Sequence, residues 1–144
     1  MMAHPVQIVI ACDDTDRMME FWAAALDYIV QPPPDGFETW EQFADTVGIP
    51  ADRRNDLGAA VDPAGVGPRI LFERWDGGAP NQRVHIDINS VGHGVADDDR
   101  PQHLAAERDR LELLGATFKT EASGMAGESW IEMFDPEENW FCVQ

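Results

Sequence analysis

The residue types best suited to chemistry fall at alternate positions of one predicted strand. In the segment 84–88, three aliphatic residues alternate with His85 and Asp87. Because side chains alternate across an extended chain, the aliphatic residues face one side, which we expect to be packed, and His85, Asp87 and Asn89 face the other. The polar side of this strand is therefore a candidate site. The alternative is a hydrogen-bonded structural histidine on a solvated sheet face.

The chain contains one pattern twice, about half its length apart. A strand, a helix and an Asp-Pro turn at Asp62 recur as a second strand, helix and Asp-Pro turn at Asp135. Repeats of this length indicate duplication of a half-domain rather than a stacked array. Gln7 and His85 occupy the same place in the two copies. We therefore expect the copies to pack about a pseudo-two-fold axis, with these two polar residues converging on a concave surface.

The first copy, residues 1–78, is predicted to fold as β-α-β-β-β. Acidic residues before the first helix cap it, and the helix ends near Tyr28. The segments 59–61 and 69–75 flank a turn rich in proline and glycine, which predicts a hairpin. Residues 40–47 have apolar side chains at helical spacing but no counterpart in the second copy. This extra helix is an ordinary packing element, a pocket lid or a dimer contact.

The second copy, residues 79–144, is predicted to repeat that order of elements after a short linker at 76–80. A polar loop over 92–99 leads into a helix that starts at Pro101 and ends at Gly115. Three strands follow, predicted at 117–119, 129–134 and 140–143.

Composition limits the function classes. The chain has 144 residues, is 44% hydrophobic and carries a formal charge of −17, which fits one folded domain. So few basic residues make nucleic acid and anionic membranes poor partners. No apolar run is long enough for a membrane span, and no signal-type segment opens the chain, so we expect a cytoplasmic protein. Cys12 and Cys142 are expected to be buried small residues, a disulfide being the alternative. Nucleotide-binding loops, serine-hydrolase elbows and CxxC pairs are absent from the sequence.

These features together resemble the vicinal oxygen chelate superfamily, which includes glyoxalase I, bleomycin-resistance proteins and extradiol dioxygenases. The resemblance covers essentially the whole chain. It rests on the opening strand, the segments 21–28 and 83–88, the Leu-Gly-Ala at 114–116 and the closing segment 135–142. The segments 32–37 and 67–72 resemble, more narrowly, a glyoxalase-like branch of small bacterial proteins.

The resemblance implies an α+β fold of two tandem modules that form a curved eight-stranded cup. In metal-dependent members, the first and last strands of each module supply one metal ligand apiece. Carried onto this chain, the ligand positions are Gln7, Glu73, His85 and Cys142, with Leu71 as the alternative register for the second. Cys142 departs from the family, which has glutamate at that place.

The implied cofactor is a divalent metal: zinc, nickel, manganese or iron. Thiolate and imidazole are good zinc ligands and a glutamate oxygen is acceptable, whereas a neutral glutamine is a poor one. The implied activity is that of a lyase, isomerase or dioxygenase on a small substrate with vicinal oxygens. Its metal stabilises the charge that develops when a carboxylate removes a proton. Glu73 and Glu132 are the candidate bases.

The competing hypothesis is a metal-free protein that binds or sequesters a small molecule, as in the bleomycin-resistance members. Pockets of this kind are largely apolar with a few orienting polar groups. The candidate ligand-binding residues are Trp40, Phe72, Trp75, Asp87, Trp130 and Trp140. A third hypothesis is a structural or regulatory module whose cup is filled by its own side chains. A homodimer is expected in each case.

Overall fold

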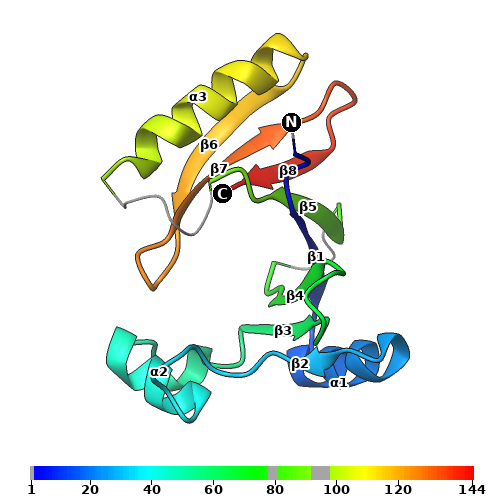
Figure 1. The fold of residues 1–144 in the computed structure, drawn as a ribbon, viewed down its shortest axis with the longest axis vertical. Helices are drawn as coiled ribbons and strands as arrows, with labels where there is room; N and C mark the ends of the chain where they lie inside the picture. The colour runs from blue at the N-terminus through cyan, green and yellow to red at the C-terminus, as the bar shows by residue number, and fades with distance from the viewer. Residues whose placement is uncertain (1, 78–80, 92–97) are drawn as a thin grey trace. The chain divides into compact units, whose positions relative to one another are not determined.

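A computed structural model describes residues 2–77, 81–91 and 98–144 (Figure 1). The predicted loop at 92–99 and linker at 76–80 therefore lie largely outside the described residues. The elements in chain order are β1 (Val6–Cys12), α1 (Thr15–Leu26), β2 (Ile29–Val30), α2 (Trp40–Val47), a 3-10 turn (Ala51–Arg53), β3 (Leu57–Val61), β4 (Arg69–Arg74), β5 (Val84–Ile88), α3 (Arg100–Leu113), β6 (Thr117–Ser123), β7 (Ser129–Phe134) and β8 (Trp140–Val143). None of the described helices is long and apolar enough to cross a membrane.

The fold is α+β, as predicted, with a mixed sheet of eight strands. The strands are hydrogen-bonded in the order β2-β3-β4-β1-β5-β8-β7-β6. Around this sheet the chain forms two compact units, and each is described by itself below. The N-terminal unit is Ile8–Val84, and the C-terminal unit joins the residues up to Gln7 with His85–Gln144. The predicted module division between residues 78 and 79 stays a prediction.

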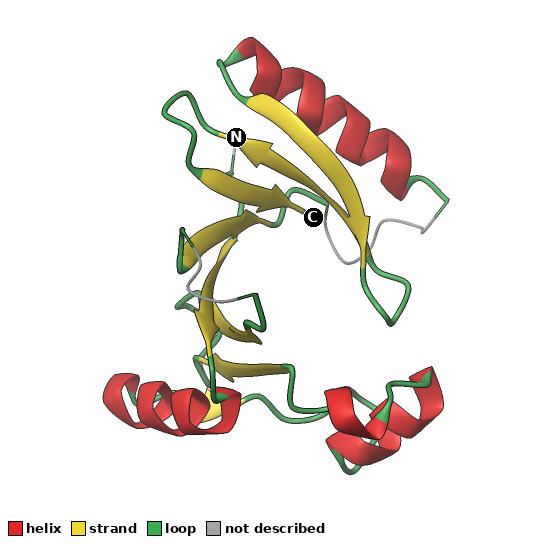
Figure 2. Ribbon diagram, turned by 180° about the vertical axis from the view of Figure 1, so that it is seen from behind, coloured by secondary structure: helices red, strands yellow, loops and turns green. Residues whose placement is uncertain are grey.

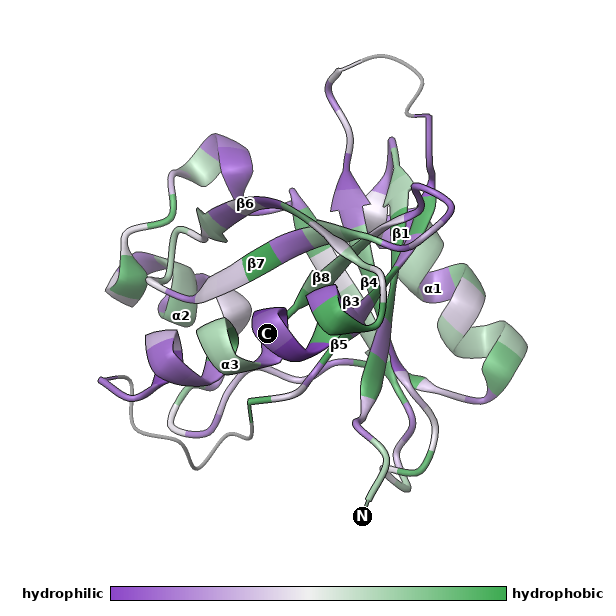
Figure 3. Ribbon diagram, turned by 90° about the horizontal axis from the view of Figure 1, so that it is seen from above, coloured by the Kyte–Doolittle hydropathy of each residue, from purple (hydrophilic) through white to green (hydrophobic). Residues whose placement is uncertain are grey.

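The N-terminal unit is built on α1 and the strands β2, β3 and β4. Asp14 caps α1 by accepting a hydrogen bond from the backbone N–H of Arg17, as the acidic segment predicted. The helix is amphipathic, with hydrophilic and hydrophobic residues along its length (Figure 3). Its apolar side packs on the antiparallel pair β3 and β4, so Phe72 and Ile70 are buried with Ala23. The predicted hairpin and the extra helix α2 are confirmed.

The C-terminal unit places α3 over β6 and β7, as Figures 1 and 2 show. Leu104 and Leu111 of α3 are buried in one cluster with apolar side chains of β7 and β8. In β7 these are Ile131 and Met133, which alternate with side chains that point to the other face. The helix thus covers one face of the strands β7 and β8. Glu132 of β7 and Cys142 of β8 belong to the face that α3 does not cover.

Two predictions about strands need correction. In β5 the aliphatic side is the exposed one, since Val84 and Ile86 are about half exposed while His85 and Asp87 are buried. The alternating aliphatic residues therefore did not mark the buried side of β5. Polar partners, described below, cover the side that carries His85 and Asp87. Strand β6 runs to Ser123, beyond the predicted end at residue 119. Its second half is polar, as expected for a strand that lies at the edge of the sheet and is mostly exposed.

The internal repeat extends to individual hydrogen bonds at two kinds of turn. Asp62 accepts from the backbone N–H two residues on, at Ala64, and Asp135 accepts in the same way from Glu137. Asp27 follows α1 and Gly115 lies just after α3, and both have positive φ. After each, a backbone N–H bonds a carbonyl five residues back, from Tyr28 to Ala23 and from Ala116 to Leu111. These equivalent turns support an origin by duplication.

Candidate functional site

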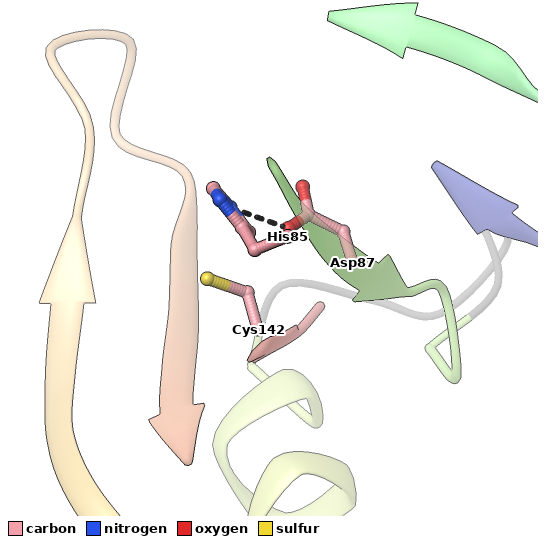
Figure 4. Close-up of side chains that lie close together, drawn as sticks. All are labelled: His85, Asp87 and Cys142. Atoms are coloured by element: carbon pink, nitrogen blue, oxygen red, sulfur yellow. Dashed lines mark ion pairs between the residues drawn. The ribbon is translucent and has the colours of Figure 1, made fainter. Parts of the chain in front are cut away.

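A buried cluster of three donor side chains lies on adjacent strands of the C-terminal unit. His85 and Asp87 come from β5, and Cys142 comes from β8, which pairs with β5 in parallel register with Cys142 beside Asp87. Because paired residues of neighbouring strands project to the same face, the three side chains converge (Figure 4). One ligand atom from each lies within 4.8 Å of the others, and all three residues are buried. The predicted common face of His85 and Asp87 is thereby confirmed.

Asp87 is the most connected member of this cluster. Its Oδ2 accepts a hydrogen bond of 2.5 Å from the side-chain amide of Gln7 and one of 3.3 Å from that of Gln144. Its Oδ1 lies 3.2 Å from Nε2 of His85, and both side chains are less than a tenth exposed. Gln144 also donates to the side chain of Asn89. The two glutamine amides thus cover one oxygen of the carboxylate and leave the other toward His85.

The imidazole of His85 lies against the indole of Trp140. Their ring centroids are 3.8 Å apart, with 33° between the ring planes. Trp140 is two residues before Cys142 on β8, so its side chain projects to the same face as the cysteine. The ammonium of Lys119 lies 5.1 Å from the centroid of the same indole, within the range of a cation–π contact. Trp140 therefore forms an aromatic wall beside the donor cluster.

Glu132, one of the two predicted bases, continues the row of side chains on this face. It is directly opposite Cys142 in the antiparallel pair of β7 and β8. Paired positions of this kind bring Cβ atoms to within about 5.5 Å. The Glu132 carboxylate is paired with Lys119 at 2.7 Å, and its side chain is 16% exposed. Trp130, two residues earlier on β7, projects to the same face.

The other predicted site residues belong to the N-terminal unit. Glu73 lies on β4, two residues after Leu71, so both registers proposed for the second ligand project to one side of that strand. Trp40 and Trp75 are partly exposed, whereas Phe72 is fully buried in the core under α1. Phe72 is therefore a packing residue of this unit, and we leave it out of the proposed site. Ligand roles for Glu73, Trp40 and Trp75 stay predictions.

The cysteines behave as the sequence predicted: both are buried, and neither forms a disulfide. For Cys12, burial and then the negative charge of Asp13 raise the pKa of the thiol. Cys12 is thus a protonated core residue, whereas Cys142 stands among donor side chains.

Two contributors to the site were missed from the sequence, Lys119 and Gln144. Gln144 follows Trp140 and Cys142 at two-residue spacing, so alternation along β8 extended by one residue would have placed it on the same face. Lys119 lies where the register of β6 against β7 shifts, between Phe118 and Thr120. Simple alternation fails at such an irregularity, so no sequence signal located that side chain.

The donor types in the cluster suit a divalent metal of intermediate softness. An imidazole nitrogen, a carboxylate oxygen and a thiolate sulfur are all zinc ligands, and three protein ligands leave a coordination position open. Asp87 supplies the carboxylate of this cluster. The cluster can therefore hold a metal with side chains of the C-terminal unit.

Comparison with known proteins places the fold. No curated protein sequence matches the chain. Among solved structures, the NAD-dependent benzaldehyde dehydrogenase from Legionella pneumophila is 10% identical with a TM-score of 0.58, over 96% of each chain. A glyoxalase/bleomycin resistance protein/dioxygenase superfamily member from Vibrio splendidus 12B01 is also 10% identical, with a TM-score of 0.52 over 98% of this chain and 97% of that one. At such low identity these likenesses show the fold alone. The family model described as a glyoxalase-like domain matches residues 7–144, so the chain belongs to the glyoxalase-like family of the vicinal oxygen chelate superfamily.

Proposed function

We propose that this protein is a metal-dependent lyase or isomerase that acts on a small substrate with two neighbouring oxygen atoms. The observation that carries the proposal is the buried cluster of His85, Asp87 and Cys142, with donor atoms within 4.8 Å of one another. Burying a carboxylate, an imidazole and a thiol together is costly unless their polar atoms find partners. A divalent cation is a partner that all three side chains can share.

The ligand chemistry favours a non-redox reaction over dioxygenase activity. Non-haem iron oxygenases use two histidines and one carboxylate, whereas a thiolate beside imidazole is typical of zinc. A zinc ion held by these residues would supply Lewis acidity toward a substrate oxygen. This choice narrows the sequence-based hypothesis, which included dioxygenases, to lyases and isomerases.

The remaining side chains of this face have roles in substrate handling. Glu132 is the candidate base for removing a proton from a carbon next to the substrate oxygens, because it is opposite Cys142 and partly exposed. Lys119 fixes the direction of that carboxylate through their ion pair. The indole of Trp140 limits the orientation of His85 and provides an apolar wall. Each of these roles uses a contact that is already present in the structure to support proton transfer.

The test is proton exchange at carbon in heavy water. Wild-type protein loaded with zinc should exchange the proton next to the carbonyl of hydroxyacetone, or of the hemithioacetal of methylglyoxal and glutathione, as followed by NMR. Glu132→Gln should slow this exchange by about 100-fold, the usual contribution of a general base. Glu121→Gln, on the exposed strand β6, is the matched control and should leave the rate unchanged. Equal rates for the wild type and Glu132→Gln would contradict the assignment of the base.

A metal-free binding protein is the second candidate, and the contact between His85 and Trp140 favours it. An indole stacked on an imidazole, with Trp130 on the same face, offers a platform for a flat ligand. Titration of bleomycin into protein freed of metal by a chelator, followed by tryptophan fluorescence, tests this candidate. Tight binding of intact bleomycin together with no exchange activity would favour sequestration. The homodimer and the cytoplasmic location stay predictions.

A further inference from the structure

The two oxygens of the buried Asp87 carboxylate have different surroundings. Oδ2 accepts hydrogen bonds from the amides of Gln7 and Gln144. Oδ1 is buried, and among the residues that the structure describes no hydrogen bond reaches it. Burying a carboxylate oxygen without a hydrogen-bond partner is energetically costly. Hydrogen bonds therefore hold the carboxylate by Oδ2, while Oδ1 faces His85 without a hydrogen bond.

The position of Oδ1 relative to His85 fits two ligands that share one metal. Oδ1 lies 3.2 Å from Nε2, yet the pair is not aligned as a hydrogen bond. Zinc bonds to histidine nitrogen and carboxylate oxygen are about 2.0–2.2 Å long, so two such ligands at the tetrahedral angle are about 3.3–3.6 Å apart. One ligand atom from each of the three residues, Sγ in the case of Cys142, lies within 4.8 Å of the others. The spacing of Oδ1 and Nε2 is thus that of neighbouring ligands.

Gln7, in contrast, already donates a hydrogen bond to Asp87. Its side-chain nitrogen donates to Oδ2 at 2.5 Å, in a contact where both residues are buried. The amide is neutral, so it brings no charge to offset a divalent cation. A carboxylate and a thiolate together offset both positive charges, which matters in a buried site where uncompensated charge is costly.

We propose that Asp87 takes the ligand position that the family pattern gives to Gln7. Oδ1 of Asp87, Nε2 of His85 and Sγ of Cys142 hold the metal, while Gln7 and Gln144 are positioning residues that fix Asp87 through Oδ2. The inference rests on the proposed function, since it requires that the cluster binds a metal. It departs from the superfamily pattern, which the sequence analysis carried onto Gln7.

The test compares Asp87→Asn with Gln7→Leu by cobalt(II) titration of the full chain. Cobalt(II) occupies zinc sites, its thiolate charge-transfer absorption reports Cys142, and its ligand-field bands report the number and type of ligands. Asp87→Asn is isosteric and removes the anionic ligand. It should lower affinity well beyond about 100-fold and change the ligand-field bands. Gln7→Leu should lower affinity by about 10-fold to 100-fold, the usual effect of losing an outer partner, and leave the bands unchanged.

Controls separate the ligand role from charge and folding. Asp109→Asn removes one exposed negative charge from α3 and should bind cobalt as the wild type does. Circular dichroism of each variant without metal checks that it is folded. If Asp87→Asn is unfolded, Gln7→Leu alone still tests the inference. If Gln7 were a metal ligand, as in the family pattern, Gln7→Leu would change the ligand-field bands of cobalt. Loss of the metal in Gln7→Leu with retention in Asp87→Asn overturns the inference. Absence of binding by the wild type overturns the proposed function itself.

Discussion

At the scale of single residues, the candidate site depends on which side chains a strand brings to one face. Alternation along β5 was sufficient to predict that His85 and Asp87 lie together, and the structure confirms it. The link from Gln7 to Asp87 was not predictable, because it depends on side-chain packing between residues 80 positions apart. The exposed side of β5 was also misjudged, since hydrophobicity alone does not say which face other parts of the chain cover.

One residue is held in an unfavourable backbone conformation at the end of α1. Asp27 has φ of 55°, in the left-handed region, where its counterpart in the second copy is Gly115. A carboxylate at a helix C-terminus is also unfavourable for the helix dipole. Asp27→Gly should therefore stabilise the protein by about 0.5–1 kcal/mol. Urea unfolding measures this change, with Asp27→Ala as the control that keeps the strain and should not stabilise as much. A lower stability for Asp27→Gly than for Asp27→Ala would contradict the explanation.

At the scale of elements, more of the helices and strands than of the side-chain contacts could be predicted from the sequence. Helices α1 and α3 and the strands β4 and β7 were predicted because each combines clear apolar periodicity with an identifiable start or end. The outer half of β6 lacked that signal because little of it is buried. Both Asp-Pro turns were identified as equivalent, and the structure shows why: each carboxylate accepts several hydrogen bonds of its own turn.

These turns should link stability to pH. Hydrogen bonds from Asn139, first from its side chain and then from its backbone, hold the pKa of Asp135 below its usual value, and the backbone N–H of Gly67 does the same for Asp62. A carboxylate with a lowered pKa in the folded state stabilises the protein above its unfolded pKa of about 3.9, and that contribution is lost as the pH falls through the folded pKa.

Asp135→Ala and Asp62→Ala should each lower the melting temperature near neutral pH. The difference from wild type should shrink toward about pH 3, as the wild-type carboxylates become protonated. Asp135→Asn is the matched control, since its amide oxygen can still accept but has no charge to titrate. Thermal unfolding across this range by circular dichroism is the measurement. A difference between Asp135→Ala and wild type that stays constant with pH would show that the carboxylate charge does not matter.

At the scale of the whole molecule, the two copies share turns and element order but differ in chemistry. The cluster of His85, Asp87 and Cys142, with its supporting residues Gln7 and Gln144, belongs entirely to the C-terminal unit. The family resemblance predicted ligands from both copies, including Glu73 of the N-terminal unit. The donor set thus comes from β5 and β8 and has no equivalent on the matching strands of the first copy. The formal charge of −17 adds a general repulsion toward anionic substrates.

The most direct test of this account is the metal content of untagged protein, by elemental analysis after zinc loading and dialysis. We predict about one zinc per chain for the wild type, as expected for a single site with three protein ligands. His85→Ala should lose this zinc, whereas His103→Ala, at an exposed position of α3, should retain it. A wild-type protein that retains no zinc, or His85→Ala with the wild-type content, would contradict the central claim that this cluster is a metal centre.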